Sequence, residues 1–139
     1  MQVRLWVPAL ALGLVVFPGV GRTALTQDSF QLRNTGDLVD VCSAAPSDPL
    51  YTAAANFCHG FAVGVFRVLN EQDMARAPGK RLFCMSDPAP TRDESVASFT
   101  QWAKANPPQL EQPPADSIAL FLSQHFPCQS GMKSKGAAR

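Results

Sequence analysis

The sequence predicts an all-α domain, a small disulfide-stapled bundle of four main helices in two hairpins. Apolar residues recur at helical spacing between residues 48 and 74 and in three further segments. Four cysteines, an even number, follow a start that is typical of an exported protein. The β-branched residues fall within the helical stripes, and the Asn-Gly and Asp-Gly turns typical of β-hairpins do not occur in the sequence.

Residues 1–21 have the pattern of a removable export signal. Arg4 precedes an apolar run from residue 5 to residue 20, and Gly19 and Gly21 supply the small residues of a cleavage site. The competing interpretation is a membrane anchor, which needs about 20 apolar residues. This run is shorter and contains two prolines. We therefore expect the mature chain to begin near Arg22, and no other segment looks apolar enough to span a membrane.

The charge of the chain is balanced. It has 12 Lys+Arg and 11 Asp+Glu, and loss of Arg4 with the signal leaves equal numbers. A nucleic-acid partner would require a concentrated basic face, so we do not expect one. Residues 22–128 have the length of one domain, and residues 129–139, which lack apolar periodicity, are expected to form a flexible tail.

The first hairpin pairs a short helix with a long central one. Thr35 is the expected N-cap of the short helix, whose apolar face ends at Cys42. Asp48 is the expected N-cap of the central helix, which runs to Met74, with Pro49 at its first position. Its apolar stripe consists of Phe57, Phe61, Val65 and Val68, flanked by Ala54, Cys58, Ala62 and Leu69.

Two glycines interrupt the central helix. Gly60 and Gly64 each cost roughly 1 kcal/mol relative to alanine in a helix interior. Such a cost suggests that another backbone approaches there, so we assign both glycines to close helix packing. A membrane dimer motif is the alternative, but the helix carries a cysteine of an exported domain.

The second hairpin follows a loop. Thr91 and Glu94 form a capping box, and Asn106 before two prolines ends the third helix. The inner stripe of this helix consists of Val96, Phe99 and Ala103. A linker, residues 109–112, leads to a last helix opened by Pro113 and Pro114. The stripe of the last helix consists of Ile118, Phe121, Leu122, His125 and Phe126.

The four cysteines are interpreted as two structural disulfides. Three pairings are open, and the hairpins favour Cys42 with Cys58 and Cys84 with Cys128. The alternative is a metal site, because histidines stand near two of the cysteines. The sequence has neither a C-x-x-C pair nor a C-x-x-C-H haem motif, so we expect no metal and no cofactor.

The sequence carries no recognisable catalytic group. Cys58 and His59 are neighbours on one helix and point about 100° apart, so they cannot act as a nucleophile–base pair. Asp93 and Glu94 fit first-turn helix charges, and His125 on an apolar face fits an interior or boundary histidine. A non-enzymatic binding protein is the remaining interpretation.

Binding groups usually lie on loops held by a rigid scaffold. The candidate contact surface is therefore the loop 76–90 together with the linker 107–112. The candidate contact residues in the loop are Lys80, Arg81, Met85 and Asp87.

Four motifs occur in a fixed order: T-G-D-L-V-D-V-C, F-C-H-G-F-A-V-G-V, L-F-C-M-S-D-P-A-P-T and H-F-P-C. In this order, after a signal peptide, the chain resembles the Rap/Tai family of immunity proteins from residue 30 to 128. The chain departs from the family at two places. At Phe61 the family often has tyrosine. Met85 to Asp87 separate Cys84 from Pro88, whereas in the family a proline usually follows the cysteine sooner.

The resemblance implies a periplasmic, non-enzymatic protein that binds and inhibits a type VI secretion peptidoglycan amidase effector. The departures bear on the subfamily and the cognate toxin. The alternative is a housekeeping periplasmic protein, chaperone-like or unassigned, on the same scaffold. Homodimer formation is left open, and no membrane association is expected after signal cleavage.

Overall fold

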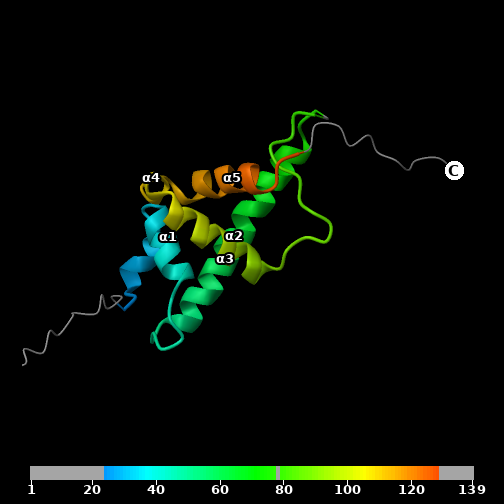
Figure 1. The fold of residues 1–139 in the computed structure, drawn as a ribbon. Helices are drawn as coiled ribbons and strands as arrows, with labels where there is room; N and C mark the ends of the chain where they lie inside the picture. The colour runs from blue at the N-terminus through cyan, green and yellow to red at the C-terminus, as the bar shows by residue number, and fades with distance from the viewer. Residues whose placement is uncertain (1–23, 78, 129–139) are drawn as a thin grey trace, which may run out of the picture.

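The computed structural model describes residues 24–77 and 79–128, and this part is all-α, as the sequence predicts. The expected signal 1–21 and tail 129–139 lie outside the described residues. No strand occurs within the described ranges. The elements are η1 (Gln27–Gln31), α1 (Thr35–Cys42), α2 (Tyr51–Met74), α3 (Arg92–Ala105), α4 (Pro107–Leu110) and α5 (Pro114–His125), shown in Figure 1.

Helix α2 is the frame of the domain. Its 24 residues extend about 36 Å at 1.5 Å per residue, along the length of the molecule (Figure 1). The helices α1, α3 and α5 contact it, and α5 crosses it towards its C-terminal end. The 3₁₀ turn η1 and the single turn α4, which the sequence did not predict, both pack against α1.

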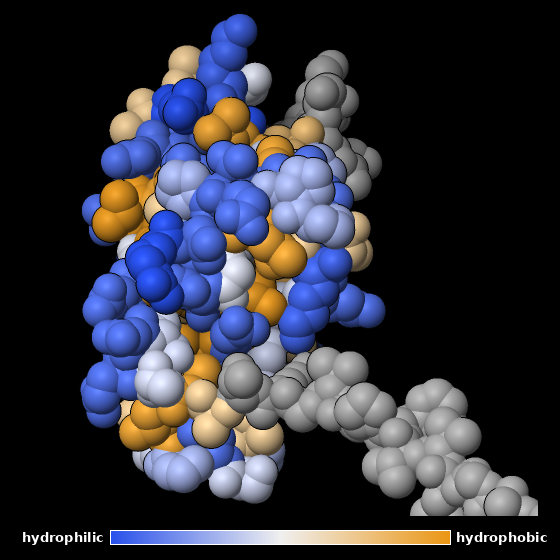
Figure 2. All heavy atoms as spheres, turned by 90° about the vertical axis from the view of Figure 1, so that its left-hand side faces the viewer, coloured by the Kyte–Doolittle hydropathy of each residue, from blue (hydrophilic) through white to orange (hydrophobic). Residues whose placement is uncertain are grey.

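The outer surface is mixed, in keeping with the balanced charge. On the face that carries η1, α1 and α4, hydrophilic residues cover most of the area and apolar residues show between them (Figure 2). Among the described residues, the exposed large hydrophobics are Tyr51, Val68, Met74, Leu82 and Leu120. Val68 was expected in the buried stripe of the central helix, and its exposure corrects that prediction.

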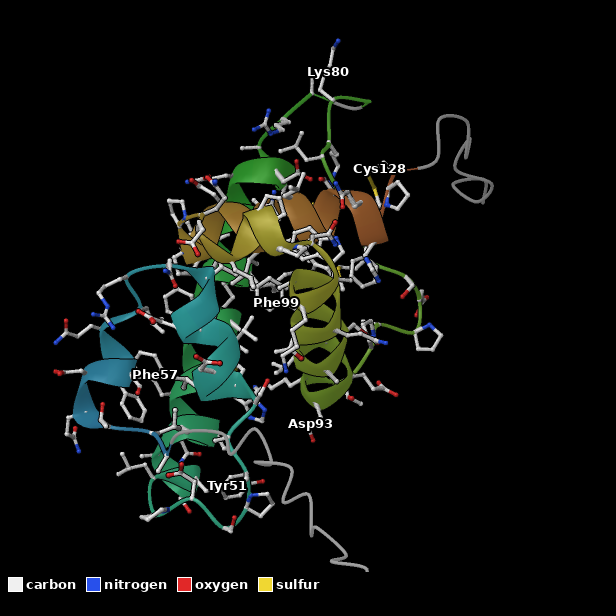
Figure 3. The ribbon with its side chains drawn as sticks, turned by 60° about the vertical axis from the view of Figure 1, so that its left-hand side comes forward. Tyr51, Phe57, Lys80, Asp93, Phe99 and Cys128 are labelled. Atoms are coloured by element: carbon white, nitrogen blue, oxygen red, sulfur yellow. A yellow bond between two sulfur atoms is a disulfide. The ribbon has the colours of Figure 1, made fainter. Side chains whose placement is uncertain are left out.

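The core forms where α1, α3 and α5 meet α2. Phe99 of α3 lies between the helices (Figure 3), and its ring centroid is 5.6 Å from that of Phe121 on α5. The main cluster of buried residues consists of Leu38, Val39, Phe83, Phe99, Ala103, Ile118, Phe121 and Leu122. A second cluster of Val41, Ala54 and Cys58 joins α1 to the first half of α2.

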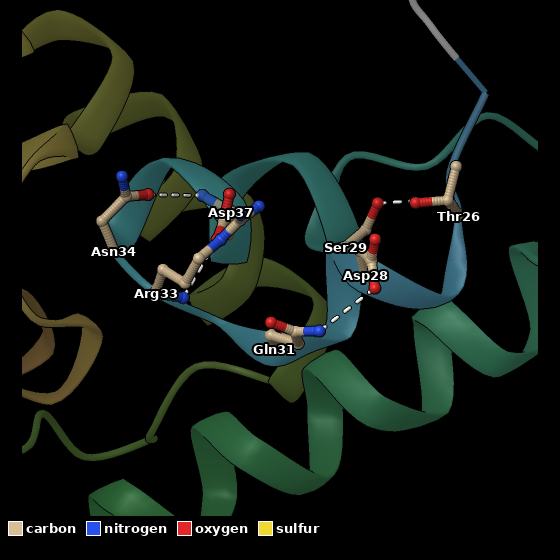
Figure 4. Close-up of polar contacts among 7 residues, drawn as sticks. All are labelled: Thr26, Asp28, Ser29, Gln31, Arg33, Asn34 and Asp37. Carbon is tan, nitrogen blue, oxygen red and sulfur yellow. Dashed lines mark hydrogen bonds and ion pairs between the residues drawn. The ribbon is translucent and has the colours of Figure 1, made fainter.

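Helix α1 begins one residue away from its predicted cap. Asn34 is the N-cap and its side-chain oxygen accepts from the amide of Asp37 at 3.0 Å (Figure 4). Thr35, the predicted cap, is instead the first helical residue and is fully buried. Its hydroxyl lies 2.8 Å from the carbonyl of Gln112 and 2.9 Å from Ser117 Oγ, so it joins the start of α1 to the start of α5.

Helix α2 begins later than predicted. Leu50 is its N-cap position, and Asp48 lies in the turn before it. The Asp48 carboxylate accepts from the amide of Leu50 at 2.8 Å and from that of Leu25 at 2.9 Å. Asp48 therefore fixes the turn and ties it to the segment before η1, rather than capping the helix.

Both predicted disulfides are confirmed. Cys42 bonds to Cys58 with their Cα atoms 5.2 Å apart, and Cys84 bonds to Cys128 with their Cα atoms 4.9 Å apart. The first joins the end of α1 to α2. The second joins the loop after α2 to the residues that follow α5, so each hairpin carries one covalent staple.

The packing role predicted for Gly60 and Gly64 is wrong. Both glycines are exposed, and a Cβ atom added at either one would meet no atom within 4 Å. Ala54 and Cys58 of the same helix are buried against Val41 of α1, whereas the two glycines are exposed. No second backbone within the described chain therefore requires glycine there.

Helix α2 also corrects the expectation that no later segment could span a membrane. By length and composition alone it is long and apolar enough to do so, a property it shares with core helices of soluble proteins. In this domain α2 is joined to α1 by a disulfide and contacts two other helices. Only 11% of its most apolar window is buried, so much apolar side-chain surface on α2 stays partly accessible.

Candidate functional site

A long loop between α2 and α3 is clamped at its start by a buried carboxylate. Asp73, in the last turn of α2, is only 2% exposed. Its Oδ1 accepts from the amide of Leu82 at 2.7 Å, and its Oδ2 accepts from Arg81 Nε at 3.2 Å. Arg76 Nε adds an ion pair at 3.4 Å. The chain therefore leaves α2 and folds back onto the end of the same helix.

The charge of Asp73 is held by these donors. Burial is the largest single influence and by itself would raise the pKa of this carboxyl group. The amides of Leu82 and Phe83 and the guanidinium of Arg81 together outweigh burial, so the pKa of Asp73 lies below its usual value. Asp73 is thus an ionised, fully bonded anchor for the loop.

Phe83 and Cys84 anchor the middle of the loop. Phe83 is 2% exposed and its ring packs 6.1 Å from that of Phe66 on α2. The amide of Cys84 donates to the carbonyl of Phe126 at 2.7 Å, beside the disulfide to Cys128. Between these anchors and the Asp73 clamp, Leu82 projects with 50% of its surface exposed.

The capping box at the end of the loop is confirmed. The Glu94 amide donates to Thr91 Oγ1 at 3.2 Å, and the Thr91 amide donates to Glu94 Oε2 at 2.8 Å. The backbone and hydroxyl donors of Thr91 lower the pKa of Glu94. The loop is thus fixed at its start, middle and end, and several exposed residues lie between these points.

The four predicted contact residues differ in their surroundings. Lys80 and Asp87 are exposed, and Lys80 lies at the opposite end of the molecule from Tyr51 (Figure 3). Arg81 is the partner of Asp73 and so has a structural role that the sequence did not reveal. Met85 is half-buried and packs against the main core. Only Lys80 and Asp87 are freely presented.

The predicted linker 107–112 lies far from this loop. Its first part is the turn α4, which packs against α1, and the carbonyl of Gln112 accepts from both the amide and the hydroxyl of Thr35. Figure 1 shows α4 and the tip of the loop at opposite ends of α5. The linker and the loop therefore do not form one continuous contact surface.

A cavity of about 300 Å³ opens between α2, α3, α5 and the loop. Its floor is formed by buried core side chains, and its rim is formed by exposed residues of α2, α3 and the loop. The floor consists of Leu38, Phe99, Ile118, Phe121 and Leu122. The floor reaches the main core, and the cavity is open to solvent at its rim.

Basic side chains stand at the mouth of the cavity. Arg67 of α2 and Arg92 of α3 line it and are exposed. His59 Nε2 lies 3.1 Å from Asp93 Oδ1, and this contact joins α2 to α3 beside the same opening. Sequence reasoning did not single out Arg67 or Arg92 and considered His59 and Asp93 only within their own helices. The two helices are separate in the sequence, and only the fold places these residues beside one opening.

The size of the cavity is energetically significant. At about 24 cal/mol per Å³ of apolar cavity, 300 Å³ corresponds to an upper bound of about 7 kcal/mol for a sealed, empty space. Solvent access through the mouth lowers that figure. A molecule that bound in the cavity of the folded chain alone would stabilise the fold by an amount set by its concentration and affinity.

The described residues offer little to a catalytic mechanism. Cys58 cannot be a nucleophile because its sulfur is bonded to Cys42, and within residues 24–77 and 79–128 no cysteine is free. No group of three His, Cys, Asp or Glu side chains in these ranges could hold a metal ion. His125 is exposed, with its ring 4.4 Å from that of Phe121, so it lies at the boundary of the core.

Comparison with known proteins gives one match. A family model described as Rap1a immunity proteins matches residues 34–128, more than half of the 139-residue chain and a span that includes all four cysteines, the loop and the cavity. No curated protein and no solved structure matches the chain.

Proposed function

The chain belongs to the Rap1a immunity protein family, and from this premise we propose that it protects its cell by binding a cognate toxin protein. The family match over residues 34–128 is the observation that carries the proposal. The finer proposal is that the toxin is a type VI secretion peptidoglycan amidase and that the two proteins meet in the periplasm. The export pattern of residues 1–21 and the order of the four motifs support it.

The clamped loop is the proposed contact surface. Lys80 and Leu82 are exposed on a segment whose neighbours are fixed by Asp73 and by a disulfide. A segment that is already ordered loses little conformational entropy on binding. An exposed apolar side chain beside a cation supplies both a group to bury and a charge to orient the partner. Asp87 adds a negative charge further along the same loop.

In this role the protein inhibits its toxin by occlusion, without turnover. An immunity protein needs shape and charge complementary to its toxin, and the loop can provide both. The half-buried Met85 and the ion-paired Arg81 then act as supports for the loop rather than as direct contacts.

Rescue of cells that express candidate toxins tests the proposal. The wild-type gene should restore growth of cells that export an amidase encoded beside it. Lys80→Glu combined with Leu82→Asp should abolish rescue and keep the thermal unfolding temperature, since both side chains are exposed. Lys104→Glu, on α3 at a distance from the loop, is the matched control and should still rescue.

Failure to rescue cells from every neighbouring amidase, or the absence of such a gene, would refute the amidase proposal. The housekeeping role would then become the better interpretation. Arg81→Glu is unsuitable as a contact variant because it would place a second carboxylate beside buried Asp73.

A further inference from the structure

We propose that the cavity between α2, α3, α5 and the loop binds a single-chain amphiphile with a carboxylate head group. The alkyl chain occupies the apolar interior, and the head group lies at the mouth between Arg67 and Arg92. This site is distinct from the proposed toxin contact, because neither Lys80 nor Leu82 lines the cavity.

The interior has the chemistry of an alkyl-chain site. Its floor consists of aliphatic and aromatic core residues, and its walls add Ala62, Val63 and Phe66 of α2 and Met85 of the loop. Ser95 also lines it, but its hydroxyl donates to the carbonyl of Thr91 at 2.8 Å. A water molecule in the interior would find few polar partners, so an apolar chain can replace it at little polar cost.

The size of the cavity favours a single chain. A volume of about 300 Å³ lies at the lower end of the range of small-molecule pockets. A two-chain lipid would require more room. The half-buried Met85 forms one wall with a flexible side chain that can adapt to the length of the occupant.

The charge at the mouth selects the head group. Arg67 and Arg92 come from two different helices, and neither has a carboxylate partner among the described residues. Asp93, the carboxylate placed beside this opening, is already paired with His59 at 3.1 Å. Two guanidinium groups without a carboxylate partner among the described residues attract an anion, and guanidinium binds carboxylate in a bidentate manner.

Fluorescence titration with 1-anilinonaphthalene-8-sulfonate, a compact anionic probe, followed by competition, tests the proposal. Lauric acid should displace the probe at least about tenfold more effectively than dodecyltrimethylammonium, which has the same chain length and the opposite charge. Native mass spectrometry of the protein purified from cells should show an added mass equal to an alkyl carboxylate. Equal competition by both amphiphiles would overturn the head-group assignment.

Two variants separate the two halves of the site. Ala62→Phe should fill the cavity, weaken probe binding at least about tenfold and raise the unfolding temperature. Arg67→Glu combined with Arg92→Glu, an exposed pair whose loss spares the core, should reverse the preference towards the ammonium amphiphile. Lys80→Glu, an equal charge reversal outside the cavity, should leave probe affinity unchanged.

Unchanged affinity in the double variant that carries Arg67→Glu and Arg92→Glu would sink the proposal even if the Ala62→Phe protein failed to fold. A third result would also overturn it: loss of protection in the Ala62→Phe variant with no alkyl carboxylate bound to the wild type. That outcome would assign the cavity to a side chain of the toxin instead.

Discussion

Replacing Asp73 by asparagine should destabilise the whole domain and release the loop first. The carboxylate accepts from two backbone amides and pairs with two arginines while only 2% exposed. Hydrogen bonds to a charged group contribute about 1.5–3 kcal/mol each, and breaking a buried ion pair costs about 3–5 kcal/mol. Arg81 and Arg76 can recover solvent because they are partly exposed. We therefore expect a net loss of about 3 kcal/mol at pH 7.

Urea unfolding followed by circular dichroism measures this loss. The pKa of Asp73 is lower in the folded protein than in the unfolded chain. Its stabilisation is therefore complete above the unfolded value, about 3.9, and is lost as the pH falls through the folded pKa. The difference in unfolding free energy between wild type and Asp73→Asn should shrink over that window. Limited trypsin digestion should cut the variant first after Lys80 or Arg81.

A loss below about 0.5 kcal/mol at pH 7 would refute this account of the clamp, since that is the range of ordinary surface substitutions. A difference that stayed constant as the pH fell would refute the electrostatic part. In that case the shape of the side chain, rather than its charge, would hold the loop.

The glycines, the second disulfide and the capping box give three more predictions. Gly60→Ala and Gly64→Ala should each raise the unfolding free energy by up to about 1 kcal/mol, because the added methyl group meets no atom; a lower melting temperature would point to a partner on that face. Changing both Cys84 and Cys128 to serine should lower the unfolding free energy by about 4 kcal/mol, since the disulfide spans 44 residues. Chemical denaturation measures this loss, and an unchanged midpoint would contradict the prediction. Thr91→Ala should lower the unfolding free energy, measured by calorimetry, by about 1 kcal/mol, because it removes the capping box. Thr91→Ser keeps the hydroxyl and should largely avoid this loss.

Local features of the fold could be predicted from the sequence. The capping box of Thr91 and Glu94 is confirmed because its partners stand three residues apart and need only the helix they begin. The disulfide pairing is confirmed because antiparallel hairpins bring neighbouring cysteines together. The predicted N-cap of α1 differs from the observed one by one residue, since both Asn34 and Thr35 can cap a helix. The Thr35 hydroxyl is instead hydrogen-bonded to residues 77 or more positions away.

Features that depend on tertiary packing could not be predicted in the same way. Asp73 carried one signal: an acidic residue in the last turn of a helix opposes the helix dipole and so suggests another partner. The partner itself, the folded-back loop, appears only in three dimensions. The cavity has no sequence signature, because it depends on how closely Phe99, Phe121 and Leu38 approach one another.

The order of the disulfides has a consequence for how the chain acquires them. Each cysteine is bonded to its neighbour in the sequence, Cys42 to Cys58 and Cys84 to Cys128. If the N-terminal end of the chain reaches an oxidant first, Cys42 and Cys58 would be joined before Cys84 becomes accessible. Oxidation in order of emergence therefore yields the native pairing directly, without the slow thiol exchange that crossed disulfides require.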